Sequence, residues 1–151
     1  MEAILAIDVG GGTQDILLYE PGKPVENCVQ LILPSQTVVV ADKIKSARAQ
    51  GRAIFLYGKL MGGGASVKAI KAHLAQGLKV YATIQAAKTI ADDLKKVGAL
   101  GIEICAGQPE GTVAVKMGDI DLETLASSLV PYGVYLPTTI AVAVQDHGES
   151  I

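Results

Sequence analysis

The segment IDVGGGTQDI, residues 7–16, joins two short apolar runs, Ala3–Val9 and Ile16–Tyr19. Apolar runs of this length that are bounded by glycine predict buried strands. The glycines between them, Gly10–Gly12, predict a tight turn, because glycine adopts backbone conformations that other residues avoid. A strand rather than a helix follows the glycines, which argues against a Rossmann fingerprint at this point. The sequence therefore predicts that the fold begins with a β-hairpin.

The turn of this hairpin is predicted to bind phosphate and a metal ion. Backbone amides in a glycine-rich turn can face an anion, because no side chain covers them. Asp8 ends the first strand, and its carboxylate suits Mg²⁺, a hard cation that prefers oxygen ligands and keeps several waters. Gln14 and Asp15 alternate along the second strand, so only one of the two can face the cleft. We assign the catalytic and metal-binding roles to Asp8, and cofactor binding to the amides of Gly10–Gly12 with the side chains of Thr13 and Gln14.

The hairpin resembles the phosphate loops of the superfamily that joins actin, sugar kinases and heat-shock chaperone ATPases. The similarity is closest to the pattern D-x-G-G-G-T-x-D, which is matched by Asp8, Gly10, Gly11, Gly12, Thr13 and Asp15. More narrowly, the chain resembles a family labelled "putative pyruvate formate-lyase activating enzyme". That label implies radical chemistry at a cluster held by a CxxxCxxC motif, whereas residues 1–151 contain only Cys28 and Cys105. We therefore expect no such cluster here.

The superfamily resemblance implies ATP and Mg²⁺ as cofactors, with ATPase or kinase-like phosphoryl transfer once a second lobe closes over the nucleotide. Residues 1–151 are then expected to form one ribonuclease-H-like lobe, the first of a longer two-lobe protein. Val142–Gly148 leads to an Asp-x-Gly sequence at which a second phosphate loop could begin. The cation that often follows the first loop in the superfamily is replaced by Gln14 or Asp15, which weakens the expectation of phosphoryl transfer.

The chain beyond the hairpin predicts an alternation of strands and helices. Three early strands with short connections predict an antiparallel meander, and the following helices end at glycines. The expected elements are strand Cys28–Leu33, helix Ser35–Gln50, strand Ala53–Tyr57, helix Ser66–Gln76, strand Leu78–Thr83 and helix Gln85–Val97. Connections between parallel strands through a helix are expected to be right-handed. The sum is an α/β fold, a ribonuclease-H-like mixed sheet with helices on both faces.

The last third of the chain continues this pattern without a linker that would mark a second domain. Pro109-Glu110-Gly111 predicts a hairpin between strands Ile102–Ala106 and Thr112–Met117. Asp121 is the expected N-cap of a helix over Leu122–Val130, because its carboxylate can accept from the first amides of the helix. A final strand is expected over Thr139–Val144.

Two other readings of the sequence remain open. The same lobe could serve as a non-catalytic binding or assembly scaffold. A dinucleotide could instead bind at Gly58–Gly64, between a strand and a helix, with Lys59 and Lys68 as its cations. Asp146 and His147 invite an acid–base role, but an Asp-His-Gly sequence is more often a turn.

Composition limits the partners and the location of the protein. The chain has 151 residues, 50% hydrophobic residues and a formal net charge of -2. No basic run exceeds Lys95-Lys96, which argues against nucleic acid as a partner. No apolar stretch approaches the roughly 20 residues of a membrane span, so we expect a cytoplasmic protein without a membrane partner. The expected partners are a nucleotide and either a second lobe or another copy of the chain.

Overall fold

The structure is a computed structural model that describes residues 2–61 and 64–144, and these divide into two compact units. Unit 1 contains the described residues 2–35 and 120–144. Unit 2 contains the described residues 36–61 and 64–119. Unit 2 is therefore inserted, in sequence, between the two halves of unit 1.

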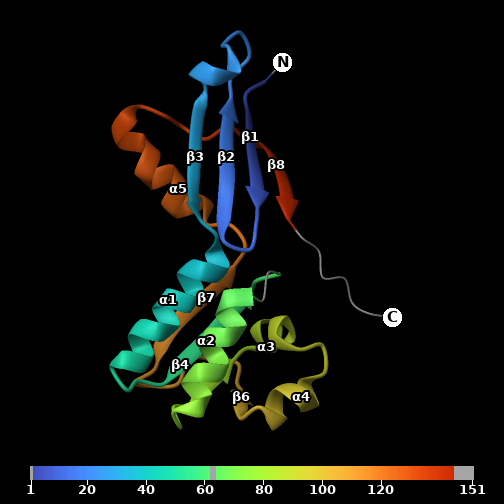
Figure 1. The fold of residues 1–151 in the computed structure, drawn as a ribbon, viewed down its shortest axis with the longest axis vertical. Coiled ribbons are helices and arrows are strands. Elements are labelled where there is room, and N and C mark those ends of the chain that lie inside the picture. Colours follow the sequence, from blue (N-terminus) through green and yellow to red (C-terminus); the bar gives the residue numbers. More distant parts are fainter. Residues whose placement is uncertain (1, 62–63, 145–151) are drawn as a thin grey trace. The chain divides into compact units, whose positions relative to one another are not determined.

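Unit 1 is a four-stranded sheet with one α-helix (Figure 1). Its elements are β1 (Ile4–Val9), β2 (Thr13–Tyr19), the 3-10 turn η1 (Val25–Asn27), β3 (Val29–Pro34), α5 (Leu122–Leu129), the 3-10 turn η2 (Val130–Tyr132) and β8 (Thr139–Val144). The strand order is β3-β2-β1-β8, in which β2 runs antiparallel to β1 and β3, and β8 runs parallel to β1. The predicted antiparallel meander is confirmed.

One face of the unit 1 sheet packs against α5. Leu5 and Ile7 of β1 and Ile16 of β2 form a buried cluster with Leu125 and Leu129 of the helix. Side chains alternate across a strand, so this packing fixes which residues of β1 and β2 point to the opposite face. The carboxylate of Asp121 accepts from the amide of Thr124 at 3.1 Å, which confirms the predicted N-cap of this helix.

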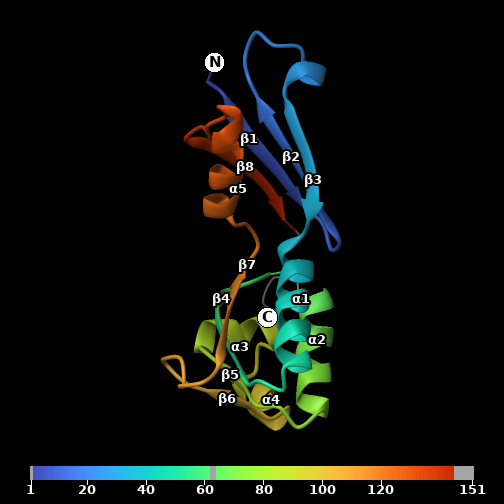
Figure 2. The ribbon, with the colours of Figure 1, turned by 90° about the vertical axis from the view of Figure 1, so that its left-hand side faces the viewer.

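Unit 2 is a four-stranded parallel sheet with four helices. Its elements are α1 (Gln36–Ala49), β4 (Ile54–Lys59), α2 (Gly64–Ala75), β5 (Val80–Ala82), α3 (Ile84–Ile90), α4 (Leu94–Ala99), β6 (Ile102–Ile104) and β7 (Val113–Gly118). The strand order is β6-β5-β4-β7, and every pair is parallel. Figure 2 shows α1 and α2 side by side. The predicted parallel βα units are thus confirmed.

The core of unit 2 lies on one face of its sheet. Ile54 and Leu56 of β4 are fully buried there together with Val80 of β5 and Val115 of β7. The helices supply the other side of this core, chiefly through alanine, valine and isoleucine. On the opposite face Tyr57 of β4 and Lys116 of β7 are exposed, whereas Phe55 of β4 is buried.

The prediction of one mixed sheet is wrong, because the strands form two sheets. The place beside β1 that a following parallel strand would take is occupied by β8, in register from Ile4↔Thr139 to Val9↔Val144. β4 pairs instead with β5 and β7. Each sheet buries one face against helices, so the expected cover of helices on both faces of a single sheet is also corrected. That residues 1–151 form the first lobe of a longer protein stays a prediction.

Two local predictions in unit 2 are also wrong. The expected hairpin around Pro109 does not form, because β6 pairs with β5 and β7 pairs with β4. The turn itself exists, since the hydroxyl of Thr112 donates to the carbonyl of Pro109 at 2.6 Å, but it joins strands that are not neighbours. The expected single helix over 85–97 is broken after Ile90, and Asp93 caps the second piece by accepting from the amide of Lys95 at 2.9 Å.

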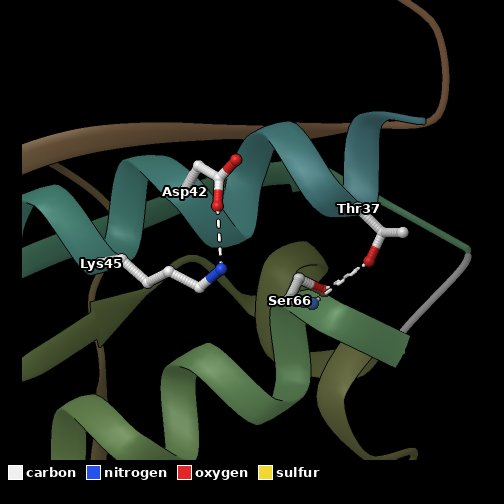
Figure 3. Close-up of polar contacts among 4 residues, drawn as sticks. All are labelled: Thr37, Asp42, Lys45 and Ser66. Carbon is white, nitrogen blue, oxygen red and sulfur yellow. Dashed lines mark hydrogen bonds and ion pairs between the residues drawn. The ribbon is translucent and has the colours of Figure 1, made fainter. Parts of the chain in front are cut away.

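Polar contacts join and support the first two helices of unit 2 (Figure 3). The side chains of Thr37 on α1 and Ser66 on α2 point toward each other, with 3.3 Å between their hydroxyl oxygens. The amide of Ser66 also donates to the Thr37 hydroxyl at 3.2 Å, so a buried helix start finds an acceptor. On the exposed side of α1, Lys45 pairs with Asp42 at 2.9 Å, a contact of little energetic weight.

His73 on α2 is fully buried in the interior of unit 2. Neither ring nitrogen reaches a hydrogen-bond partner within the described residues. Burial lowers the pKa of His73 below 6.5, and the charge of Arg48 lowers that pKa further. Backbone groups of Arg52, Lys79 and Ile44 oppose the shift only in part. The imidazole is therefore neutral in the folded protein where an exposed histidine would begin to take up a proton.

The neutral His73 makes stability depend on pH. Well above pH 6.5 neither the folded nor the unfolded state holds a proton on this ring. Below pH 6.5 the unfolded chain binds a proton that the folded chain does not, so the free energy of unfolding is expected to fall until the folded-state pKa is reached. Urea unfolding at several pH values measures this slope, and His73→Leu should flatten it. An equal slope in the variant would assign the effect to other groups.

Candidate functional site

The glycine-rich turn between β1 and β2 is open to solvent. The amide of Gly10 donates to the carbonyl of Thr13 at 2.9 Å and closes the hairpin. The amide of Ser35 donates to the carbonyl of Gly12 at 3.0 Å, which ties the turn to the end of β3. Within the described residues no acceptor meets the amides of Gly11 and Gly12, and apart from the adjacent residues no atom lies within 4 Å of a β-carbon built on either. These two amides are available to an anion.

Asp8 and Asp15 face each other across the hairpin. They are direct register partners in β1 and β2, and both are exposed. Thr13 points to the same face, because it lies two residues before Asp15 in the strand. Two like charges placed directly opposite each other destabilise a sheet, and a bound divalent cation would relieve that repulsion. The residues present therefore fit Mg²⁺ that keeps most of its waters.

Gln14 lies on the other face of the sheet from Asp8. Its side chain is 5% exposed, and its Nε2 donates to the carbonyl of Pro34 at 3.0 Å. This amide donor is therefore committed to holding β2 against β3. Of the two alternating residues, the structure turns Asp15 toward the face of Asp8, and the sequence assignment had included Gln14 alone.

A shallow pocket of about 590 Å³ covers the Asp8 face of the sheet. Its lining is mostly apolar and comes from all four strands and from η1, a set of neighbours that the sequence alone did not indicate. Besides Asp8 and Asp15, the lining includes Ala6, Leu17, Val25, Gln30, Ile32, Ala141 and Ala143. Only the pairing of β8 with β1 brings the last two alanines here. The pocket thus places two carboxylates beside apolar surface that could contact the body of a ligand.

Within the described residues of unit 1, no lysine or arginine is left without a carboxylate partner to bind a phosphate. Within it Lys23 is the only lysine or arginine, and its Nζ lies 2.6 Å from a carboxylate oxygen of Glu20. The described acidic residues of unit 1 are Glu2, Asp8, Asp15, Glu20, Glu26, Asp121 and Glu123. A phosphate at the turn would be repelled by this charge unless a divalent cation accompanied it. No group of three or more metal-ligating side chains occurs in the described part of the chain, so such a cation would rely on the two aspartates and water.

Comparison with known proteins identifies a family. One family model, described as "Putative pyruvate format-lyase activating enzyme (DUF1786)", matches residues 61–151, more than half of the chain. This chain belongs to that family. No curated protein and no solved structure matches it. The matched residues of this DUF1786 member include most of unit 2 and the α5–β8 half of unit 1, whereas the hairpin lies before them.

The other sequence candidates are placed as follows in this DUF1786 chain. Gly58 has φ of 89°, and a β-carbon on it would overlap the carbonyl oxygen of Met117 in β7. Its role is therefore explained by close packing of two strands. Lys59 and Lys68 are both exposed, and residues 62–63 of the proposed dinucleotide loop lie outside the described residues. Asp146 and His147 also lie outside them.

The two cysteines lie in different units, and the helices bear on the question of a membrane span. Cys28 is buried in unit 1, and Cys105 is half-buried in unit 2. None of the helices in residues 2–61 and 64–144 is long and apolar enough to cross a membrane.

Proposed function

We propose that unit 1 binds the phosphates of ATP together with Mg²⁺ at the turn formed by Gly10–Gly12. The observation that carries the proposal is the pair Asp8 and Asp15, which face each other beside two backbone amides without acceptors in the described chain. Asp8 would hold Mg²⁺ through water, with Asp15 as its second carboxylate. The amides of Gly11 and Gly12 would bind phosphate oxygens, and the Thr13 hydroxyl would add a donor.

The topology of unit 1 supports an actin-type, ribonuclease-H-like lobe. An antiparallel meander is followed, after the inserted unit 2, by a helix and by a strand that joins the sheet parallel to β1. Because β1 and β8 are parallel and in register, the hairpin turn after β1 and the C-terminal end of β8 lie at the same end of the sheet. In such a lobe Mg²⁺ neutralises phosphate charge, and the protein contributes mainly positioning. ATPase or kinase-like transfer would then require a second lobe.

The family description does not point to a different chemistry in these residues. An activating enzyme of the radical type holds its cluster with closely spaced cysteines. Residues 1–151 place Cys28 and Cys105 in different units and carry no such motif. We therefore base the proposed function on the hairpin and not on the words of the family description.

Thermal unfolding with and without Mg²⁺ tests the proposal. ATP with Mg²⁺ is expected to raise the melting temperature, because a ligand that binds only the folded state stabilises it by about 2.7 kcal/mol at 100 times its Kd. ATP in excess EDTA should give no rise, since unit 1 offers no free cation to phosphate. A rise that is equal in EDTA, or no rise at millimolar nucleotide, would contradict the proposal.

A second candidate function is assembly, and the exposed edge strand β8 favours it. All six residues of β8 are exposed, and β1 is its only strand neighbour in the described chain. The strand carries Ile140, Val142 and Val144 without a charge or a proline that would discourage pairing. If the chain is a scaffold, sedimentation should detect a self-associated species. Its melting temperature should then not change when nucleotide is added.

A further inference from the structure

We propose that unit 2 has a binding site of its own, for a small organic anion with a planar apolar body. The site is a pocket of about 640 Å³ formed entirely by unit 2. Its lining residues are Tyr57, Gly58, Thr83, Ile84, Gln85, Ile104, Cys105 and Ala106. None of them belongs to the hairpin of unit 1, so the inference is independent of the proposed nucleotide site.

The pocket lies where the strands of the parallel sheet end. Tyr57 and Gly58 come from the end of β4, Thr83 directly follows β5, and Cys105 directly follows β6. Ligands of open parallel sheets bind in the crevice outside the carboxyl ends of the strands, where loops diverge and leave space. The position therefore favours a ligand site over an accidental gap in packing.

Apolar surface is concentrated around this pocket. The exposed fractions of Tyr57, Ile84 and Ile104 are 37%, 56% and 40%, although each is a large apolar side chain. The ring of Phe55 stacks on that of Tyr57 with 6.0 Å between the centroids and 13° between the planes. Phe55 is buried, so it fixes the orientation of the Tyr57 ring. A flat apolar group on the ligand would find a rigid partner in that ring.

The charge around the pocket favours an anion. Lys116 of β7 is the direct register partner of Tyr57, so it lies beside the ring on the same face of the sheet. Lys59, the last residue of β4, is a second exposed lysine near this end of the strand. Among the described residues the pocket lining itself is uncharged, so Lys116 would act from beside the pocket, and the carboxylate of Glu103 on β6 already pairs with Lys79 at 3.5 Å. Positive charge near the pocket agrees with the composition of unit 2, which holds every lysine and arginine of the chain except Lys23.

The experiment uses a matched set of probes in EDTA, with amide NMR spectra of the isotopically labelled full chain. 2-Naphthoate has the planar body and the charge, 2-naphthamide has the body alone, and acetate has the charge alone. 2-Naphthoate is expected to shift the amides of Tyr57, Thr83 and Cys105 and to bind at least about tenfold more tightly than either control probe, a difference of about 1.4 kcal/mol. Equal binding of naphthoate and naphthamide, or shifts confined to residues outside unit 2, would overturn the proposal.

Three variants and one chemical readout localise the site. Lys116→Gln should weaken naphthoate binding several-fold and leave naphthamide binding unchanged, whereas Tyr57→Leu should weaken both. Lys71→Gln makes the same charge change on an exposed residue of α2 and should have no effect. Bound naphthoate should also slow alkylation of the half-buried Cys105 by iodoacetamide, followed by peptide mass spectrometry. Unchanged alkylation at saturating naphthoate, or equal losses in Lys71→Gln and Lys116→Gln, would place the ligand elsewhere.

Discussion

Asp8→Asn is expected to remove the Mg²⁺-dependent part of ATP binding and to leave the chain folded. The amide has the size of the carboxylate but lacks the negative charge that attracts Mg²⁺. The substitution also removes one of two like charges that face each other across β1 and β2, so the free energy of unfolding should not decrease. Calorimetry with Mg²⁺ should show an affinity loss of at least about tenfold, or about 1.4 kcal/mol.

The effect of Asp8 can be separated from a general loss of negative charge. Glu123→Gln removes the same charge from unit 1, but Glu123 is exposed on α5, which packs on the other face of the sheet. This control should bind ATP with Mg²⁺ as the parent chain does. Asp15→Asn should give a smaller loss than Asp8→Asn, because Asp8 would remain as the principal carboxylate. Equal affinities of Asp8→Asn and Glu123→Gln would exclude the turn as the metal site.

The hairpin was predictable from the sequence because its signals are local. Two apolar runs and Gly10–Gly12 define both strands and the turn, and the observed register Asp8↔Asp15 follows from the short loop. The choice between Gln14 and Asp15 was not predictable, because it depends on which face of β2 is buried. That face is set by α5, more than a hundred residues later, and by the bond from Gln14 to Pro34. The sequence therefore indicated the turn as a candidate site, but it could not decide which of the two side chains shares a face with Asp8.

The strand pairing of unit 2 and the separation of charge between the two units could not be predicted from local sequence patterns. The turn signal at Pro109 is real, but a turn does not reveal whether the strands on its two sides are neighbours. Likewise, the formal net charge of -2 conceals that unit 1 is acidic and unit 2 basic. That separation becomes visible only when the chain is divided after Ser35 and before Ile120. Strand order and charge separation therefore depend on contacts between residues that are far apart in the sequence.

Gly58→Ala is expected to destabilise unit 2 strongly. Gly58 has φ of 89°, a conformation that an alanine rarely adopts, and its β-carbon would overlap the carbonyl oxygen of its register partner Met117. The unfavourable φ and the overlap each cost about 1–3 kcal/mol, so a loss of about 2–6 kcal/mol in the free energy of unfolding is expected. Because backbone rather than a flexible side chain is in the way, β4 and β7 cannot relax without breaking their pairing.

Two glycine variants distinguish the overlap from the backbone conformation. Gly51→Ala, just after α1, carries the same kind of positive φ of 64° but meets no atom within 4 Å, so only the conformational cost applies. Gly98→Ala in α4 has neither cost and should stabilise its helix slightly. Urea unfolding of the three variants should rank Gly58→Ala far below Gly51→Ala, with Gly98→Ala at or above the parent. If Gly58→Ala unfolds at the same urea concentration as Gly51→Ala, the contact with Met117 is not what requires glycine, and a ligand at the end of β4 becomes the better explanation for that residue.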